Sequence, residues 1–423
     1  MEKARKWIYL PEKYQLVVGD TFELFYRGVI LANAPYTYNI KVSCPKGAAY
    51  RRKFVFTPTP EDVGTYTLEL SLIDDWGRLL DRQAVALVVN PATASPMKDT
   101  YILCVGDSIT ASGAWPSECM RRFCGISGEP MGLELHNIHF VGSREGQYGA
   151  RYEGYGGWRF DSYNNRCHHA SPSQYIYADH GKTDLDRHST YTDRGSLWKL
   201  EEIEDGRIKV IGTKYLGPLP QSGTLHHVSG GEDHKDIIFT KVEEAAGNPF
   251  WDLPKGCVDF QSYAKRIGAP DINICVVILG WNAWNSSEQE IKEQACIFIE
   301  NLHRDYPACQ ILLVGPHTTA NQDGFGTNYG ASPNWNYFEK LEFAFLLDGW
   351  YRELADAYAY VTYVNMAGQF DSEYNYPTIE RKANMRVCTT EIIQANGLHP
   401  TNEGYNQIAD IIFRQLNAIL LNL

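Results

Sequence analysis

The sequence lacks a long apolar run and a basic cluster. Its longest apolar runs, such as Ile274 to Leu279, fall far short of the roughly 20 residues that cross a bilayer. Lys and Arg number 39 against 51 Asp and Glu, and nowhere do they gather into a stretch that could follow a phosphate backbone. We therefore expect no membrane span, and neither nucleic acid nor an anionic membrane surface as a partner.

The ten cysteines include no Cys-x-x-Cys pair, so the sequence does not indicate a structural zinc ribbon. Cys104, Cys275 and Cys296 lie in apolar segments, which favours buried free thiols over a disulfide framework. The basic N-terminus, Met1 to Lys6, is not followed by the roughly 7–15-residue apolar segment of a signal peptide. We expect a soluble protein, periplasmic or extracellular if a leader was removed and otherwise cytoplasmic.

The chain has 423 residues, 44% hydrophobic and 21% charged, which is typical of two or three globular domains rather than of a disordered protein. Residues 1–95 carry short alternating segments separated by turn residues. This period-2 pattern predicts an immunoglobulin-like β-sandwich as an accessory domain. The alternating segments are 14–18, 21–26, 52–56, 65–70 and 84–89.

From residue 100, apolar strands alternate with amphipathic helices. This alternation predicts an α/β domain over 96–423, with a parallel sheet covered on both faces. The expected strands are 101–105, 138–141, 274–279, 311–314 and 360–364, and the expected helices lie near 115–125, 287–305, 335–358 and 402–421.

Between about residues 165 and 255 the alternation lapses, which predicts an insertion in the α/β domain. The segment is polar, and a hairpin is predicted from Trp198–Glu204 and Arg207–Ile211. Many of the chain's histidines fall here without metal-ligand spacing or an accompanying carboxylate pattern, so no metal site is expected. These histidines are His168, His169, His180, His188, His226, His227 and His234.

Two residues could form a nucleophile and its base. Ser108, in Gly-Asp-Ser, follows the first strand of the α/β domain, at the sheet edge where ligands bind. His399 precedes Pro400 on the loop that enters the last helix, so it is a candidate general base for the Ser108 hydroxyl. Taken singly, Ser108 is more often part of an ordinary turn, and His399 is more often a solvated loop residue.

Two further blocks supply hydrogen-bond donors. Asn282 follows a strongly apolar strand in Gly280-Trp281-Asn282, and Gly157 lies in a glycine-rich loop from Glu153 to Trp158. Acyl transfer needs donors aimed at the developing oxyanion, and glycine N–H groups with an Asn carboxamide are suitable donors. A tight turn or a helix cap would use the same residue types.

In this order, the four blocks resemble the SGNH hydrolase superfamily, also called GDSL-type esterases, over about residues 100–423 apart from the insertion. The resemblance implies a flavodoxin-like three-layer sandwich, with Ser108 as nucleophile and His399 as base. It also implies an oxyanion hole formed by the Ser108 and Gly157 amides and the Asn282 side chain. No metal or organic cofactor is implied.

One position departs from the family pattern in a way that bears on mechanism. Asn396 stands three residues before His399, where the family usually has Asp. An Asn carbonyl can accept the imidazole N–H but brings no negative charge, and the same change in a serine protease costs about 10⁴ in turnover. Three readings follow: a Ser108–His399 dyad supported by Asn396, a carboxylate from elsewhere such as Asp371 or Glu391, or a weakened enzyme. We favour the dyad.

Resemblance to multidomain bacterial members with an accessory sandwich favours the removal of O-acetyl groups from carbohydrate. The expected partner is then a small-molecule, oligosaccharide or polysaccharide ester, and the accessory domain is expected to pack on the catalytic domain rather than to bind glycan. The alternatives are an acylhydrolase or lipase acting on fatty esters or thioesters, and a glycan-binding protein with a degraded active site. Tryptophans near the blocks or on the insertion could stack on sugars or simply pack: Trp115, Trp158, Trp251, Trp281 and Trp284.

Overall fold

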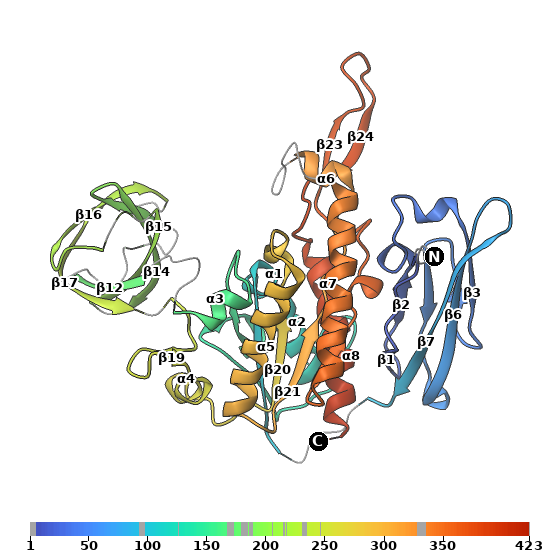
Figure 1. Cartoon of the computed structure of the whole chain (residues 1–423), viewed down its shortest axis with the longest axis horizontal. Helices are drawn as coiled ribbons and strands as arrows, with labels where there is room; N and C mark the ends of the chain where they lie inside the picture. The colour runs from blue at the N-terminus through green and yellow to red at the C-terminus, as the bar shows by residue number, and fades with distance from the viewer. Residues whose placement is uncertain are drawn as a thin grey trace. The chain divides into compact units, whose positions relative to one another are not determined.

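The computed structural model divides by its internal contacts into two compact units (Figure 1). The first unit comprises Met1–Gly157, Ala269–Lys292 and Ala308–Leu423, and the second comprises Trp158–Gly268 and Glu293–Pro307. The described residues are 6–92, 98–125, 127–166, 173–178, 185, 189–204, 206–214, 216, 218–230, 235–245, 247–327 and 336–422.

Residues 6–92, here called the N-terminal sheets, form two sheets over one hydrophobic core. Alternate residues point inward from both sheets, as Leu16, Leu24, Phe54 and Leu87 do. The first sheet has the order β1 (Lys13–Val17), β7 (Leu79–Asn90), β6 (Gly64–Ile73), β3 (Asn39–Ser43), and the second has the order β2 (Phe22–Phe25), β5 (Lys53–Phe56), β4 (Ala48–Ala49). The predicted β-strands are therefore present, and the immunoglobulin-like assignment stays a prediction.

The α/β part of the first unit is built on a mainly parallel sheet, as predicted. All five predicted strands are present, and each pairs in parallel with a neighbour. The sheet has the order β10 (Arg144–Glu145), β11 (Arg151–Gly154), β8 (Thr100–Gly106), β20 (Ile274–Ile278), β21 (Gln310–Val314), β22 (Val361–Val364), with β9 (Ile138–Val141) also paired to β8. The sequence did not predict β11, whose last residues, Glu153 and Gly154, were expected in a loop.

Helices cover this sheet. Phe123 and Ile412, from α2 and α8, share a buried core with Ile102 and Val276 of the central strands. Leu103, on the opposite face of β8, is buried as completely. The helices of this unit are α1 (Ser108–Ala111), α2 (Ala114–Cys124), α6 (Gln322–Thr327), α7 (Tyr337–Ala357) and α8 (Asn402–Leu420). A further helix, α5 (Glu288–Asp305), begins in this unit and continues into the second. A two-stranded hairpin, β23 (Thr378–Lys382) and β24 (Thr390–Gln394), precedes α8.

The second unit contains a closed barrel, whose ring of strands is visible in Figure 1. The predicted hairpin is confirmed, since β14 (Ser196–Glu204) pairs antiparallel with β15 (Arg207–Lys214). The other barrel strands are β12 (Ser173–Ala178), β13 (Thr190–Asp193), β16 (Gly223–Ser229) and β17 (Ile237–Ala245). The unit also has α3 (Phe160–Asn164), α4 (Phe260–Ile267), β18 (Trp251–Asp252) and β19 (Cys257–Val258).

Two of the seven insertion histidines lie in the described part of the chain. His226 Nδ1 is 2.7 Å from Asp236 Oδ2, and His227 Nε2 is 2.7 Å from the Gly230 carbonyl oxygen. Among the described residues, no helix has both the length and the hydropathy to cross a membrane. Outside the described residues lie His168, His169, His180, His188 and His234.

A buried ion cluster joins the N-terminal sheets to the helices of the first unit. Asp20 accepts a hydrogen bond from Arg414 of α8 at 3.0 Å and lies 3.3 Å from Arg122 of α2. Arg122 also pairs with Asp410, so the cluster balances two guanidinium groups against two carboxylates. Because Asp20, Arg122 and Arg414 are each at most 5% exposed, removing one charge leaves the others without compensation in a poorly solvated site.

Replacing Asp20 with Ala is expected to lower the free energy of unfolding by about 3 kcal/mol, because two buried guanidinium groups lose a counter-charge. Urea denaturation of the native protein and the variant measures the difference. Asp75→Ala is the control, since this carboxylate of the N-terminal sheets is exposed and its loss should cost less than about 0.5 kcal/mol. Equal losses in the two variants would contradict a structural role for the cluster.

Candidate functional site

Ser108 lies at the carboxyl edge of the parallel sheet. β8 ends at Gly106, and Ser108 is the first residue of α1. The Asp107 side chain caps this helix, because its Oδ1 accepts from the Ile109 backbone N–H at 3.0 Å. The end of the strand, the cap and the short helix thus place Ser108 at the edge of the sheet.

His399 reaches the same edge from the other end of the chain. It precedes α8, whose first turn is capped by the Thr401 side chain. Its Nε2 is 2.8 Å from Ser108 Oγ, a hydrogen-bond distance. When the serine hydroxyl donates to Nε2, the imidazole is neutral and carries its proton on Nδ1. The two residues that the sequence singled out as nucleophile and base are thus in contact.

Burial of His399 lowers its pKa from the ordinary value of 6.5. The cause is loss of water around the ring, which disfavours the charged imidazolium. Near neutral pH the ring is therefore uncharged, the state in which Nε2 can accept a proton from Ser108.

Asn282 is tied to the residue before the serine. It lies in the short helix η6 (Trp281–Ala283), directly after β20, and its Nδ2 donates to Asp107 Oδ2 at 3.1 Å. Burial raises the pKa of Asp107 to about 7, while its hydrogen bond from the Ile109 N–H acts in the opposite direction. One carboxyl group thus organises both the α1 cap and the Asn282 amide, whose nitrogen carries a second hydrogen.

The glycine-rich loop lies beside Ser108. A Cβ added to Gly156 would lie 4.0 Å from Ser108 Cβ, and one added to Gly154 would lie 2.4 Å from the Ala111 backbone nitrogen. Gly157 has φ of +80°, in the left-handed region that favours glycine. The backbone can therefore approach the serine closely here, as an amide donor to an oxyanion must, and the role of Gly157 in an oxyanion hole stays a prediction.

Asn396 acts on the backbone of the histidine loop. Its Oδ1 accepts from the N–H groups of Leu398 and His399, at 2.9 and 2.8 Å. This Asx-type turn shapes the chain just before the imidazole. The predicted contact between the Asn396 carbonyl and the imidazole N–H stays a prediction.

The two carboxylates considered as replacements for the missing Asp have other partners. Asp371 accepts from Arg52 at 2.7 Å. Glu391 lies on the β23–β24 hairpin and accepts from Arg381 at 3.0 Å. Both charges are therefore already compensated by arginine.

His317 is a part of the site that the sequence reasoning missed. It is fully buried, its Nδ1 accepts from Trp281 Nε1 at 3.3 Å, and its Nε2 is 2.8 Å from the Leu398 carbonyl oxygen. Because an indole N–H can only donate, His317 must be neutral, with its proton on Nε2 and directed at Leu398. It thereby joins the element that carries Asn282 to the loop that carries His399. The sequence did offer a signal for His317, because it closely follows the predicted strand 311–314 and so should lie near the same sheet edge as Ser108.

The tryptophans divide between core and surface. Trp115 is fully buried and donates to Thr110 Oγ1 at 3.2 Å, so it packs in the core. Trp284, two residues after Asn282, is 41% exposed, and Lys340 Nζ lies 3.4 Å from its ring centroid. Burial lowers the pKa of Lys340 to about 8. Trp284 is therefore partly exposed, and its ring already contacts the Lys340 ammonium.

Comparisons with known proteins gave matches among solved structures alone. A scan against family models and a search of curated proteins found nothing. A carbohydrate acetylesterase family member from Sinorhizobium meliloti is similar at 15% identity and a TM-score of 0.33, over 77% of this chain and 100% of that one. A carbohydrate esterase family 3 structure from Talaromyces cellulolyticus matches at 13% identity and a TM-score of 0.34, over 77% and 99%.

A family two carbohydrate esterase from Cellvibrio japonicus is similar over more of the chain. It covers 95% of this chain and 85% of its own length, at 14% identity and a TM-score of 0.27. At identities and TM-scores this low, the matches are likenesses and decide neither the family nor the substrate of this protein.

Replacing His317 with Gln should change how stability depends on pH. Burial lowers the pKa of His317 to about 4, against 6.5 for the unfolded chain. Between these values the unfolded state binds more protons, so this group's contribution is fully present above pH 6.5 and is lost as the pH falls to about 4. Glutamine can still accept and donate but does not titrate.

Urea denaturation at several pH values measures the effect. The stability of the native protein relative to His317→Gln should fall by about 3 kcal/mol as the pH drops through this window. Buried carboxyl groups such as Asp107 titrate in both proteins and cancel in the difference. A pH-independent difference would rule out a buried neutral His317.

Proposed function

We propose that the protein is a serine ester hydrolase with Ser108 as nucleophile and His399 as general base. The observation that carries this proposal is the 2.8 Å contact between Ser108 Oγ and His399 Nε2 at the carboxyl edge of a parallel sheet. The neutral state of the buried imidazole supports it, because a base must be unprotonated to act.

The proposed reaction has two stages. Ser108 Oγ attacks the ester carbonyl while His399 Nε2 takes the hydroxyl proton, and the tetrahedral intermediate collapses as the imidazolium returns that proton to the leaving alkoxide. Water then attacks the acyl-enzyme while His399 takes its proton, and the second intermediate collapses to release the acid as the imidazolium returns that proton to Ser108 Oγ. The amides of Ser108 and Gly157 and the Asn282 carboxamide would donate to both oxyanions. The Asp107–Asn282 hydrogen bond supports this role, since it holds the carboxamide next to the serine turn.

We propose a dyad rather than a triad with a carboxylate. Asp371 and Glu391 pair with arginines, and Asn396 supports the dyad by shaping the backbone of the histidine loop. In such a dyad no carboxylate stabilises the imidazolium, as the Asp does in a Ser-His-Asp triad. This predicts a slower enzyme, not an inactive one.

For the substrate, we propose O-acetyl groups on carbohydrate. The resemblance of the Ser108, Gly157, Asn282 and His399 blocks to SGNH hydrolases supports this assignment. The partly exposed Trp284, close in sequence to Asn282, is a residue type that suits contact with a sugar. A lipase acting on fatty esters remains the second candidate. An intact Ser108–His399 contact speaks against a glycan-binding protein with a degraded site.

We also propose the finer architecture that the resemblance implies: an SGNH hydrolase domain over 96–423 with an insertion at about 165–255, and an immunoglobulin-like sandwich over 1–95. The strand order β1-β7-β6-β3 facing β2-β5-β4 over a shared core supports the latter.

Hydrolysis of p-nitrophenyl acetate tests the proposed function. The native protein should release p-nitrophenol, and Ser108→Ala should retain no more than about 10⁻³ of that rate, because only the binding and oxyanion groups remain. Equal rates for the two proteins would eliminate Ser108 as the nucleophile. A preference for p-nitrophenyl octanoate over acetate would favour the lipase reading.

The acid limb of the pH profile should identify the base. Because His399 must be neutral and burial lowers its pKa, kcat/KM should be level above pH 6.5 and fall only as the pH drops through a lower value. Initial rates on p-nitrophenyl acetate, corrected for buffer hydrolysis, measure this profile. A limb centred near pH 7 would instead report the Asp107 carboxyl and contradict the assignment.

A further inference from the structure

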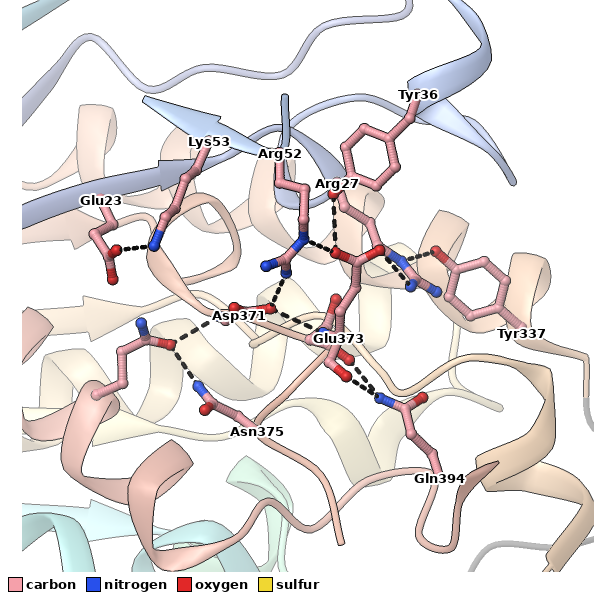
Figure 2. Close-up of polar contacts among 12 residues, drawn as sticks. Glu23, Arg27, Tyr36, Arg52, Lys53, Tyr337, Asp371, Glu373, Asn375 and Gln394 are labelled. Carbon is pink, nitrogen blue, oxygen red and sulfur yellow. Dashed lines mark hydrogen bonds and ion pairs between the residues drawn. The ribbon is translucent and has the colours of Figure 1, made fainter. Parts of the chain in front are cut away.

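The N-terminal sheets contribute two arginines to a cluster of charges on the α/β part of the first unit (Figure 2). Arg52 Nη2 donates to Asp371 at 2.7 Å, and Arg52 Nε donates to Glu373. Arg27 lies 3.8 Å from the other Glu373 oxygen and donates to the Tyr337 hydroxyl at 2.9 Å. The four side chains are between 11% and 27% exposed and balance two positive with two negative charges.

The two carboxylates belong to one short segment, residues 371–377, which connects the end of the sheet to the β23–β24 hairpin. The backbone N–H of Asp371 and the side-chain amide of Asn375 both donate to Gln407 Oε1 on α8, at 2.7 and 2.6 Å. The segment is therefore held on one side by arginines of the N-terminal sheets and on the other by the last helix.

The same segment supports both ends of the loop that carries His399. On the upstream side, Gln394 Nε2 donates to the carbonyl oxygens of Ser372 and Glu373 at 2.8 and 3.1 Å, and the Ala395 N–H donates to Pro377 at 2.7 Å.

On the downstream side, the Thr401 N–H donates to the Asn375 carbonyl oxygen at 2.8 Å. Residues 396–400, which contain Asn396 and His399, are thus suspended between two attachments to segment 371–377. Figure 2 shows Gln394 and Asn375 on the side of this segment away from Arg52.

We propose that Arg52 is a positioning residue for His399, acting through segment 371–377, so that the N-terminal sheets are part of the catalytic apparatus. This inference rests on the proposed ester hydrolysis. The physical reason is that Arg52 bridges two carboxylates two residues apart. Without it, their like charges repel at short range in a partly buried site, and the carbonyl oxygens beside them lose their fixed positions. A misplacement of about 1 Å at a reacting group costs as much as 10²-fold in rate.

The chain offers a matched control at the next residue. Lys53 carries the same charge, has a side chain 32% exposed against 27% for Arg52, and pairs with Glu23 inside the N-terminal sheets. Loss of Lys53 removes a comparable ion pair, but that pair does not involve segment 371–377.

The first experiment compares the kinetics of Arg52→Ala and Lys53→Ala with the native protein on p-nitrophenyl acetate, below the unfolding temperature of each. Arg52→Ala should lower kcat by roughly 10- to 100-fold with KM changed less than about twofold, because His399 is displaced from Ser108 while substrate binding is kept. Lys53→Ala should keep the native kcat. Arg52→Lys should recover part of the loss, since one ammonium can neutralise but not bridge both carboxylates. A kcat of Arg52→Ala equal to that of Lys53→Ala overturns the proposal.

The second experiment does not depend on turnover. Histidine labelled with ¹³C at Cε1 gives an NMR titration for each ring, and His399→Gln assigns the His399 signal. In the native protein and in Lys53→Ala, this signal should titrate below pH 6.5, whereas in Arg52→Ala it should move up toward 6.5 as the loop loosens and water reaches the ring.

The two measurements separate the possible failures. If the native protein hydrolyses no ester, the proposed function fails, and the His399 titration still decides whether Arg52 positions the ring. An unchanged titration in Arg52→Ala overturns the positioning role whatever the kinetics. If Arg52→Ala does not fold, Arg52→Gln serves in its place. It keeps part of the side-chain length, removes the bridging charge, and should shift kcat and the His399 titration in the same directions.

Discussion

The site depends on one hydrogen bond between residues 291 positions apart, Ser108 and His399. Residues this far apart in the chain are not held together by local backbone structure, so the surrounding residues must fix both side chains in place. On the serine side, Asp107 caps α1 and accepts from Asn282. On the histidine side, Asn396 bonds the loop backbone, and His317 reaches Leu398 from the end of a neighbouring strand. Much of the surrounding polar structure serves to keep two atoms 2.8 Å apart.

Burial of titratable groups is the second theme of the site. Loss of water favours the neutral form of three groups: it raises the pKa of Asp107 and lowers the pKa of His317 and of His399. A poorly solvated environment strengthens every hydrogen bond that forms there, and it makes each unpaired polar group costly. The same loss of water makes the stability of the protein sensitive to pH. For His317 stability is lost as the pH falls, because the buried ring must take up a proton, whereas for Asp107 stability is lost as the pH rises through about 7, because the buried carboxyl must ionise.

Several features could be predicted because they are local. Strands 274–279 and 311–314 are continuous apolar runs, and Ser108, Asn282 and His399 each stand where such a run or a helix meets a loop. β11 was missed because it is only four residues long and ends in glycine. The barrel was missed because it closes through the pairing of β12 with β15 and β17, and such long-range register leaves no mark in a local pattern.

By itself, the sequence determined which residue types stand at the ends of which strands, and hence the chemistry available at the sheet edge: a hydroxyl, an imidazole, a carboxamide and glycine amides. Only the tertiary structure decided which of them meet and in what state. It placed His399 within hydrogen-bond distance of Ser108. It directed the Asn396 side chain to the backbone of its own loop, and it paired Asp371 with Arg52 of the N-terminal sheets. The reason is physical: hydrogen-bond distance, desolvation and charge compensation are properties of neighbours in space, which a linear order of residues does not contain.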